Sequence, residues 1–293
     1  MTNLITLGLL ILVHTIQGQT QLTLHTVDSD GHPIAVWEKG SKPELSPILF
    51  VHGRTWSGVP DFDLQVEGED LSLMDGMIEK GFATYAIDLR GYGATPRDST
   101  GWLQPITAAK DVASVLDWIS KRHQQKVHLF GWSMGSTVSL LTTNKYPEHI
   151  KTLTLFGFWM DLDQEIPSSD VNAPAKITNT AEAAASDFIT PGSISQKAID
   201  RYVEMALQAD PVRTDLSHLD QYNAIKPSKI ELPVLILQGE FDPIAPTSLQ
   251  SKLFTRLKSS KKSWIVIPGG DHAAFMEKPR NYFINVFSQF LQD

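Results

Sequence analysis

Residues 126–144 read KVHLFGWSMGSTVSLLTTN, and the architecture follows from how this segment must fold. An apolar strand pattern at 126–130 passes through the turn GWSMG into a helical pattern at 136–144. Gly131 and Gly135 give such a tight turn the small residues it needs. Ser133 is then held in a strained conformation with its hydroxyl exposed above a sheet, which is a nucleophile elbow. The alternative is a glycine-flanked turn without chemistry.

Strand and helix patterns alternate on both sides of this segment. The expected strands are 21–26, 34–38, 47–51, 82–89, 126–130, 153–158, 232–238 and 263–267, and the expected helices are 70–80, 107–122 with Thr107 as the cap, 136–144, 246–257 and 279–291. This alternation predicts an α/β fold with a mostly parallel central sheet and helices on both faces. The rhythm is lost at 159–230, where the short helical patterns 181–188, 195–209 and 214–225 lie between prolines. We therefore expect a core of 19–158 and 231–293, with 159–230 as a cap inserted on top of the sheet.

A serine hydroxyl needs an adjacent base, which is itself oriented by a third group. His272 and Asp242 each follow a predicted strand, so both are expected at the carboxyl edge of the sheet, where Ser133 lies. The chain order Ser, Asp, His matches one hydrolase architecture. Glu240 and Asp271 remain rival acids.

The segment His52-Gly53-Arg54 directly follows the strand 47–51. The backbone amide of Arg54, together with that of Met134, is expected to form an oxyanion hole. We interpret the side chain of His52 as a brace for this loop rather than as a catalyst.

The side chain of Arg54 is unusual so close to an oxyanion hole. It can bind a carboxylate or carbonyl of the substrate, or it can pair with a nearby acid. The favoured interpretation is pairing, and the candidate acids are Asp61, Asp63 and Glu67.

Composition excludes several other kinds of chemistry. The chain has 293 residues, 25 Lys and Arg against 33 Asp and Glu, a net charge of −8 and no basic run, which argues against a nucleic-acid partner. The absence of cysteine excludes disulfides, thiolate metal sites and a cysteine nucleophile. The acidic segment 161–165 starts like a calcium loop, but Ile166 stands where such a loop needs glycine, so no metal site is predicted.

Residues 1–20 read MTNLITLGLLILVHTIQGQT. The apolar stretch 4–13 is too short for a firm membrane span but suits a signal peptide of residues 1–18, with cleavage after Gly18. The sequence therefore predicts a secreted or periplasmic protein. No Lys or Arg precedes the apolar stretch, so the alternative is an uncleaved segment that associates with a membrane.

The chain resembles the α/β-hydrolase superfamily from residue 21 onward. The resemblance rests on VHGRTW at 51–56, DLRGYG at 88–93, GWSMG at 131–135, and GEFD with GGDH at 239–242 and 269–272. It implies Ser133 as nucleophile, His272 as general base and Asp242 as the acid that orients it, with no cofactor. The resemblance is strongest to esterases, lactonases and cofactor-free haloperoxidase-like hydrolases. Epoxide hydrolases and haloalkane dehalogenases share the fold but carry Asp at the elbow, where this chain has Ser133.

These residues predict a serine hydrolase that cleaves a carboxylic ester or lactone through an acyl-enzyme. Trp56, Trp132, Phe158 and Trp159 are expected near the pocket mouth with Met134, which favours a small hydrophobic substrate. The other interpretation is that these aromatic residues only pack the cap on the sheet. Hydrolysis of a diketone C–C bond, perhydrolysis and a non-catalytic binding function remain alternatives, and the oligomeric state is not predicted.

Overall fold

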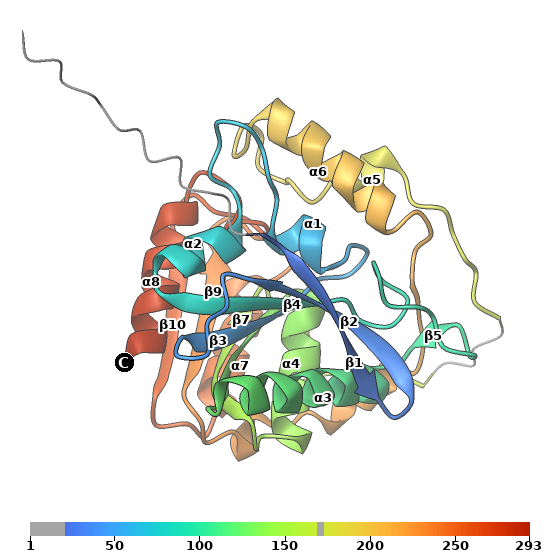
Figure 1. Cartoon of the computed structure of the whole chain (residues 1–293). Coiled ribbons are helices and arrows are strands. Elements are labelled where there is room, and N and C mark those ends of the chain that lie inside the picture. Colours follow the sequence, from blue (N-terminus) through green and yellow to red (C-terminus); the bar gives the residue numbers. More distant parts are fainter. Residues whose placement is uncertain (1–20, 169–172) are drawn as a thin grey trace, which may run out of the picture.

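A computed structural model of the chain describes residues 21–168 and 173–293 (Figure 1). Its centre is an eight-stranded sheet in the order β1-β2-β4-β3-β6-β7-β9-β10. Strand β2 pairs antiparallel with both β1 and β4, and all the other neighbouring strands pair in parallel. The strands are β1 (Thr23–Ser29), β2 (His32–Lys39), β3 (Ser46–Val51), β4 (Phe82–Ile87), β6 (Val127–Trp132), β7 (Ile150–Phe156), β9 (Val234–Gly239) and β10 (Lys262–Ile267). This confirms the predicted α/β fold with a mostly parallel sheet.

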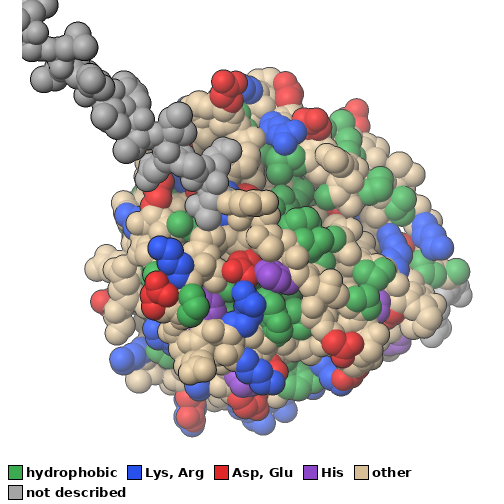
Figure 2. Space-filling view, in the orientation of Figure 1, with side chains coloured by type: hydrophobic (Ala, Val, Ile, Leu, Met, Phe, Trp, Pro, Cys, Tyr) green, Lys and Arg blue, Asp and Glu red, His purple; other side chains and the backbone are tan. Residues whose placement is uncertain are grey.

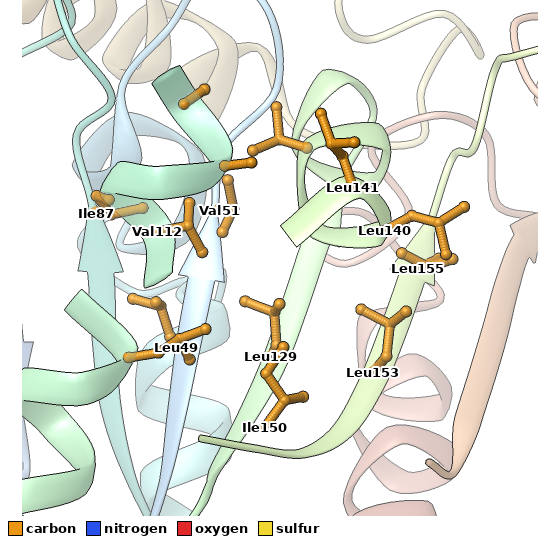
Figure 3. Close-up of a cluster of buried hydrophobic side chains, with 14 of the residues drawn as sticks. Leu49, Val51, Ile87, Val112, Leu129, Leu140, Leu141, Ile150, Leu153 and Leu155 are labelled. Atoms are coloured by element: carbon orange, nitrogen blue, oxygen red, sulfur yellow. The ribbon is translucent and has the colours of Figure 1, made fainter. Parts of the chain in front are cut away.

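Helices cover both faces of the sheet, as the alternating pattern predicts. One face carries α3 (Pro105–His123), α4 (Met134–Lys145) and α7 (Thr247–Arg256), and the other carries α1 (Gly58–Phe62), α2 (Leu73–Glu79) and α8 (Arg280–Gln292). In β3, Leu49 and Val51 pack toward α3 and α4 (Figure 3), whereas Ile48 and Phe50 pack toward α2 and α8. Because both faces are buried, the inner strands are continuous apolar runs.

The cap segment lies above the end of the sheet where α1 begins (Figure 1). It contains α5 (Ala181–Ala185) and α6 (Gln196–Ala209), and Ala198, Tyr202 and Ala206 form the buried stripe of α6 at a spacing of four residues. Asp210 follows α6, and its carboxylate accepts the backbone N–H groups of Ser57 and Gly93, each at 2.8 Å. These bonds fasten the cap to two loops of the core.

The prediction of one helix over 214–225 is wrong. Residues Asp215–Leu216 form β8, which pairs with β5 (Trp102–Leu103), and a 3-10 helix η1 (Leu219–Ala224) follows. His218 lies between them with a left-handed φ of 53°, a conformation that interrupts an α-helix. A second 3-10 helix, η2 (Pro227–Lys229), ends the cap segment.

Two element boundaries also differ from the prediction. Helix α3 begins at Pro105, not after a cap at Thr107, because proline needs no N–H partner in the first turn. Helix α2 begins at Leu73 rather than at residue 70, because the hydroxyl of Ser72 caps it by accepting the N–H of Asp75 at 2.9 Å.

The predicted signal peptide at residues 1–18 lies outside the described residues, so its cleavage and the export of the chain stay predictions. Within residues 21–168 and 173–293, no helix is both long enough and apolar enough to cross a membrane. Figure 2 shows basic and acidic side chains interspersed over one face of the molecule.

The helix after the elbow sits directly against backbone carbonyls of the core. A Cβ atom on Gly135 would lie 2.1 Å from the carbonyl oxygen of Val51, and one on Gly131 would lie 2.3 Å from the carbonyl oxygen of Gly135. Real Cβ atoms do not approach so closely, so any larger residue must move the strand or the helix.

We expect Gly135→Ala to lower the free energy of unfolding by about 3 kcal/mol, because a backbone carbonyl cannot rotate away as a side chain can. Gly53→Ala is the matched control, since its Cβ would meet side chains and not backbone, with the Trp132 ring nearest at 3.2 Å, and should cost about 1 kcal/mol. Urea unfolding measures both. Equal losses in the two variants would contradict the close-approach argument.

Candidate active site

Ser133 joins β6 to α4 in a strained conformation. Its φ of 53° and ψ of −117° are rare for a residue with a Cβ, and such outliers concentrate at functional sites. The N–H of Ser133 donates to the carbonyl of Phe156 at 2.9 Å, and its carbonyl accepts the N–H and the hydroxyl of Ser136 at 2.9 and 2.6 Å. These bonds hold the strained turn and leave the side-chain hydroxyl free to act.

His272 and Asp242 meet as a buried pair. The Nδ1 of His272 donates to Oδ2 of Asp242 at 2.8 Å. The other oxygen of Asp242 accepts the N–H groups of Ile244 and Ala245 at 2.9 and 3.1 Å, which fixes the carboxylate. With the proton on Nδ1, the Nε2 of His272 is left as an acceptor for a hydroxyl proton.

The two rival acids have other partners. Glu240 accepts the N–H of Gly269 at 2.8 Å. Asp271 accepts the N–H groups of Thr190 and Ala273 at 2.6 and 3.1 Å, so it links the cap to the core. The structure therefore places Asp242, and neither rival, against the imidazole.

The end of β7 brings the imidazole to the edge of the sheet where Ser133 lies. Phe156 accepts the N–H of Ser133, and a Cβ atom on the next residue, Gly157, would lie 2.8 Å from Cε1 of His272. The indole N–H of Trp132 donates to the carbonyl of His272 at 2.6 Å. Trp132 thus positions the histidine loop, a role that the sequence did not indicate.

The side chain of His52 stabilises the loop after β3 by two hydrogen bonds. Its Nε2 accepts the N–H of Leu89 at 3.1 Å, so Nδ1 carries the proton and donates to the carbonyl of Gly53 at 2.8 Å. Complete burial lowers the pKa of His52 to about 4, which keeps the ring neutral. The interpretation of His52 as a loop brace is confirmed.

Two backbone amides are available for an oxyanion. Met134 is the first residue of α4, so its N–H has no acceptor within the helix. Gly53 donates its N–H to Asp61 at 3.3 Å, whereas the N–H of Arg54 makes no hydrogen bond within the part of the chain that the structure describes. Their use as an oxyanion hole stays a prediction that this arrangement permits.

The predicted pairing of the Arg54 side chain is wrong. Asp61 accepts the hydroxyl of Tyr202 and Asp63 pairs with Lys39 at 2.7 Å, both in the buried interior. Across the described residues no carboxylate, that of Glu67 included, lies within ion-pair distance of Arg54. For Asp61 and Asp63 the physical reason is burial, because both point inward while the Arg54 side chain is exposed; Glu67 is exposed and still lies beyond ion-pair distance.

A buried network of two carboxyls and a tyrosine lies beside the site, and no sequence pattern indicated it. The hydroxyl of Tyr202 lies 2.9 Å from Oδ1 of Asp61 and 3.1 Å from Oδ2 of Asp187. One hydroxyl proton cannot serve both acceptors, so one carboxyl must itself be protonated. Burial raises the pKa of Asp61 well above its usual range and that of Asp187 to about 6, while the neighbouring His272 acts to lower the latter.

The predicted pocket residues are mostly interior. Trp56, Trp132 and Phe158 are buried, and the partly buried Trp159 packs edge-on to Tyr222 with ring centroids 6.3 Å apart. Substrate contact through these four residues stays a prediction.

The acidic segment 161–165 is held by the adjacent helix α7. Asp161 and Asp163 pair with Lys252 at 2.7 and 2.8 Å, and Asp163 also pairs with Arg256. Over the described ranges, no group of three or more His, Asp or Glu side chains is arranged to hold a metal ion.

The chain matches the family model Hydrolase_4, described as serine aminopeptidase, S33, over residues 69–279. It is 25% identical to a pimeloyl-[acyl-carrier protein] methyl ester esterase of Neisseria meningitidis, a match that covers 82% of this chain and 91% of the relative. It is 25% identical to the 2-(acetamidomethylene)succinate hydrolase of Mesorhizobium japonicum, covering 84% and 87%. Among solved structures, a serine hydrolase involved in carbazole degradation superposes with a TM-score of 0.67 at 16% identity, covering 93% and 99%.

We expect Asp242→Asn to slow the reaction of Ser133 with a fluorophosphonate by about a thousand-fold or more, because an amide no longer holds the reactive tautomer of His272. Glu240→Gln is the matched control, because Glu240 bonds only a loop N–H, and the change should alter the rate less than about threefold. The measurement is the labelling rate of each purified variant. A larger loss in Glu240→Gln would move the acid to that residue.

The raised pKa of Asp187 makes stability depend on pH. At a pH below its ordinary value of 3.8 the group is protonated in both folded and unfolded protein, and above about 6 the folded state bears the cost of a buried charge. Relative to wild type, Asp187→Asn should therefore gain up to about 3 kcal/mol between pH 4 and 6. Urea unfolding across that range measures the gain. The exposed Asp200→Asn is the control, and a flat difference for Asp187→Asn would contradict the prediction.

Proposed function

This chain belongs to the Hydrolase_4 (serine aminopeptidase, S33) family of α/β-hydrolases, and on that premise we propose that it cleaves a carboxylic ester or lactone with Ser133 as nucleophile. His272 accepts the proton of the Ser133 hydroxyl as the oxygen attacks the carbonyl carbon. Asp242 stabilises the imidazolium that forms and fixes its orientation.

The attack gives a tetrahedral intermediate whose oxyanion accepts the N–H groups of Arg54 and Met134. Each such donor is worth about 3 kcal/mol in comparable sites. The alcohol leaves with a proton from His272, which yields an acyl-serine. A water that gives its proton to His272 then attacks the acyl carbon and releases the acid, restoring the Ser133 hydroxyl.

The observation that carries the proposal is that the strained Ser133 and the buried His272–Asp242 pair lie at the same edge of the sheet. Ser133 bonds to Phe156, and His272 packs on the residue that follows it. A nucleophile, its base and an orienting acid within one such constellation support acyl transfer over simple ligand binding.

Ester chemistry is supported over amide or C–C cleavage by the name of one group of relatives. A methyl ester esterase is among the curated relatives that match over more than 80% of this chain. Ester cleavage also requires the least stabilisation of the leaving group by the site, because an alcohol leaves more readily than an amine or a carbanion. We therefore assign the ester or lactone class to this chain.

We expect serine-dependent hydrolysis of p-nitrophenyl esters from acetate to decanoate. Ser133→Ala should lower kcat/KM by at least about a thousand-fold and leave the urea midpoint nearly unchanged, because the hydroxyl makes no bond on which the fold depends. The chain-length optimum measures the acyl pocket. Retention of full activity in Ser133→Ala would refute the assignment. Turnover of diketones, but of no ester or lactone, would refute the ester or lactone class and keep the nucleophile.

A further inference from the structure

Two arginines at the mouth of the site have no acidic partner. Arg54 belongs to the loop that supplies the proposed oxyanion amide, and Arg213 belongs to the cap. Among the residues that the structure describes, neither side chain forms an ion pair, and the Nε of Arg213 is buried without any hydrogen bond. A buried guanidinium N–H without an acceptor is costly, so a partner is expected from outside the described chain.

Contacts through the turn at 91–92 connect the segment that carries Arg213 to the loop that carries Arg54. Thr214, next to Arg213, donates its hydroxyl to the carbonyl of Gly91 at 2.6 Å. The next residue, Tyr92, packs its ring on His52 with centroids 4.5 Å apart, and its hydroxyl accepts the N–H of Thr55 at 3.5 Å. The cap segment at 213–214 is thus fastened, through the turn at 91–92, to the loop that carries Arg54.

The electrostatics of the two side chains agree with this placement. Partial burial is the largest cause that lowers the pKa of the Arg54 guanidinium, and the positive charge of Arg213 is the next. Two guanidinium groups that repel each other raise the free energy of the unliganded site, and an anion between them removes that cost.

Asp215 acts to raise the pKa of Arg54, but its carboxylate already has partners of its own. Asp215 is already bound by the N–H groups of Ala175 and Lys176, each at 3.1 Å, and by Arg97 at 3.4 Å. Tyr92 is buried, and burial raises the pKa of its hydroxyl, so it stays neutral.

We propose that Arg54 and Arg213 bind a carboxylate of the substrate, so that the preferred ester carries a negative charge, as in a half-ester of a dicarboxylic acid. A carboxylate presents two oxygens that match guanidinium donors, and such charge-assisted bonds are strong and selective. Because the amide of Arg54 is the proposed oxyanion donor, its exposed side chain branches from the residue that would bind the reacting carbonyl. This inference rests on the proposed function and names its substrate class.

The test compares monomethyl esters of dicarboxylic acids, from four to eight carbons, with neutral methyl esters of the same chain lengths. Wild type should prefer at least one half-ester by at least about tenfold in kcat/KM, and added salt should reduce that preference. Arg213→Gln and Arg54→Gln should each lower the preference by about tenfold. Each keeps a long polar side chain, and Arg54→Gln keeps the backbone amide.

The matched control is Arg201→Gln. Arg201 is an exposed arginine of the cap that pairs with Glu204 at 2.6 Å, so its loss changes the net charge by the same amount without touching the proposed subsite. The half-ester preference should stay at its wild-type value in this variant. An equal loss of preference in Arg201→Gln would show that only the general charge matters and would overturn the subsite.

A binding measurement separates failure of the subsite from failure of the proposed function. Calorimetry on Ser133→Ala should show tighter binding of the half-ester than of the neutral ester, and Arg213→Gln added to it should remove the difference. Active wild type without half-ester preference would overturn the carboxylate subsite and leave the ester hydrolase standing. Loss of all ester turnover and of fluorophosphonate labelling would overturn the hydrolase, while the calorimetry still decides whether the two arginines bind the carboxylate.

Discussion

The close approach of α4 to the ends of β3 and β6 is the constraint on which the site depends. The surrounding backbone leaves no room for a Cβ atom at positions 131 and 135. Because Gly131 and Gly135 lack a Cβ, the chain can turn from strand to helix within a single residue. Ser133 occupies that residue, and its backbone takes a conformation that few side chains tolerate. The free-energy cost of this strained conformation is offset by the packing of parallel strands that are buried on both faces. A site of this kind therefore needs a large hydrophobic core.

Polar bonds, more than apolar contacts alone, set the cap against the core. Asp210 binds backbone N–H groups in two core loops, and Asp271 binds the N–H of Thr190 in the cap. Tyr202 joins the buried core carboxyl of Asp61 to the partly buried cap carboxyl of Asp187. Such bonds are strong where water is excluded, and they are directional, so they fix where the cap lies above Ser133.

Charge is distributed unevenly around the site. On the inner side, Asp61 and Asp187 lie in surroundings that favour their protonated forms, because burial penalises the carboxylate. On the side of the oxyanion loop, Arg54 and Arg213 form no ion pair among the described residues, and the charge of Arg213 helps to lower the pKa of Arg54. A chain whose net charge is −8 thus offers positive charge beside its reactive serine.

The sequence by itself determined the order of the main-sheet strands and of the longer core helices, the elbow, and Asp242 and His272 as residues at the carboxyl edge of the sheet. These features are local: apolar runs specify buried strands, and glycine spacing specifies the turn. It could not place the 3-10 helix and short strand of the cap, because their conformations depend on pairing with Trp102–Leu103 and on His218 at positive φ. Only the tertiary structure decided that Asp61 turns inward to Tyr202, that Trp132 holds the histidine loop, and that Arg54 lies near the charge of Arg213 and pairs with no acid. Each of these contacts joins residues far apart in the chain, and its free energy depends on burial, which no local pattern records.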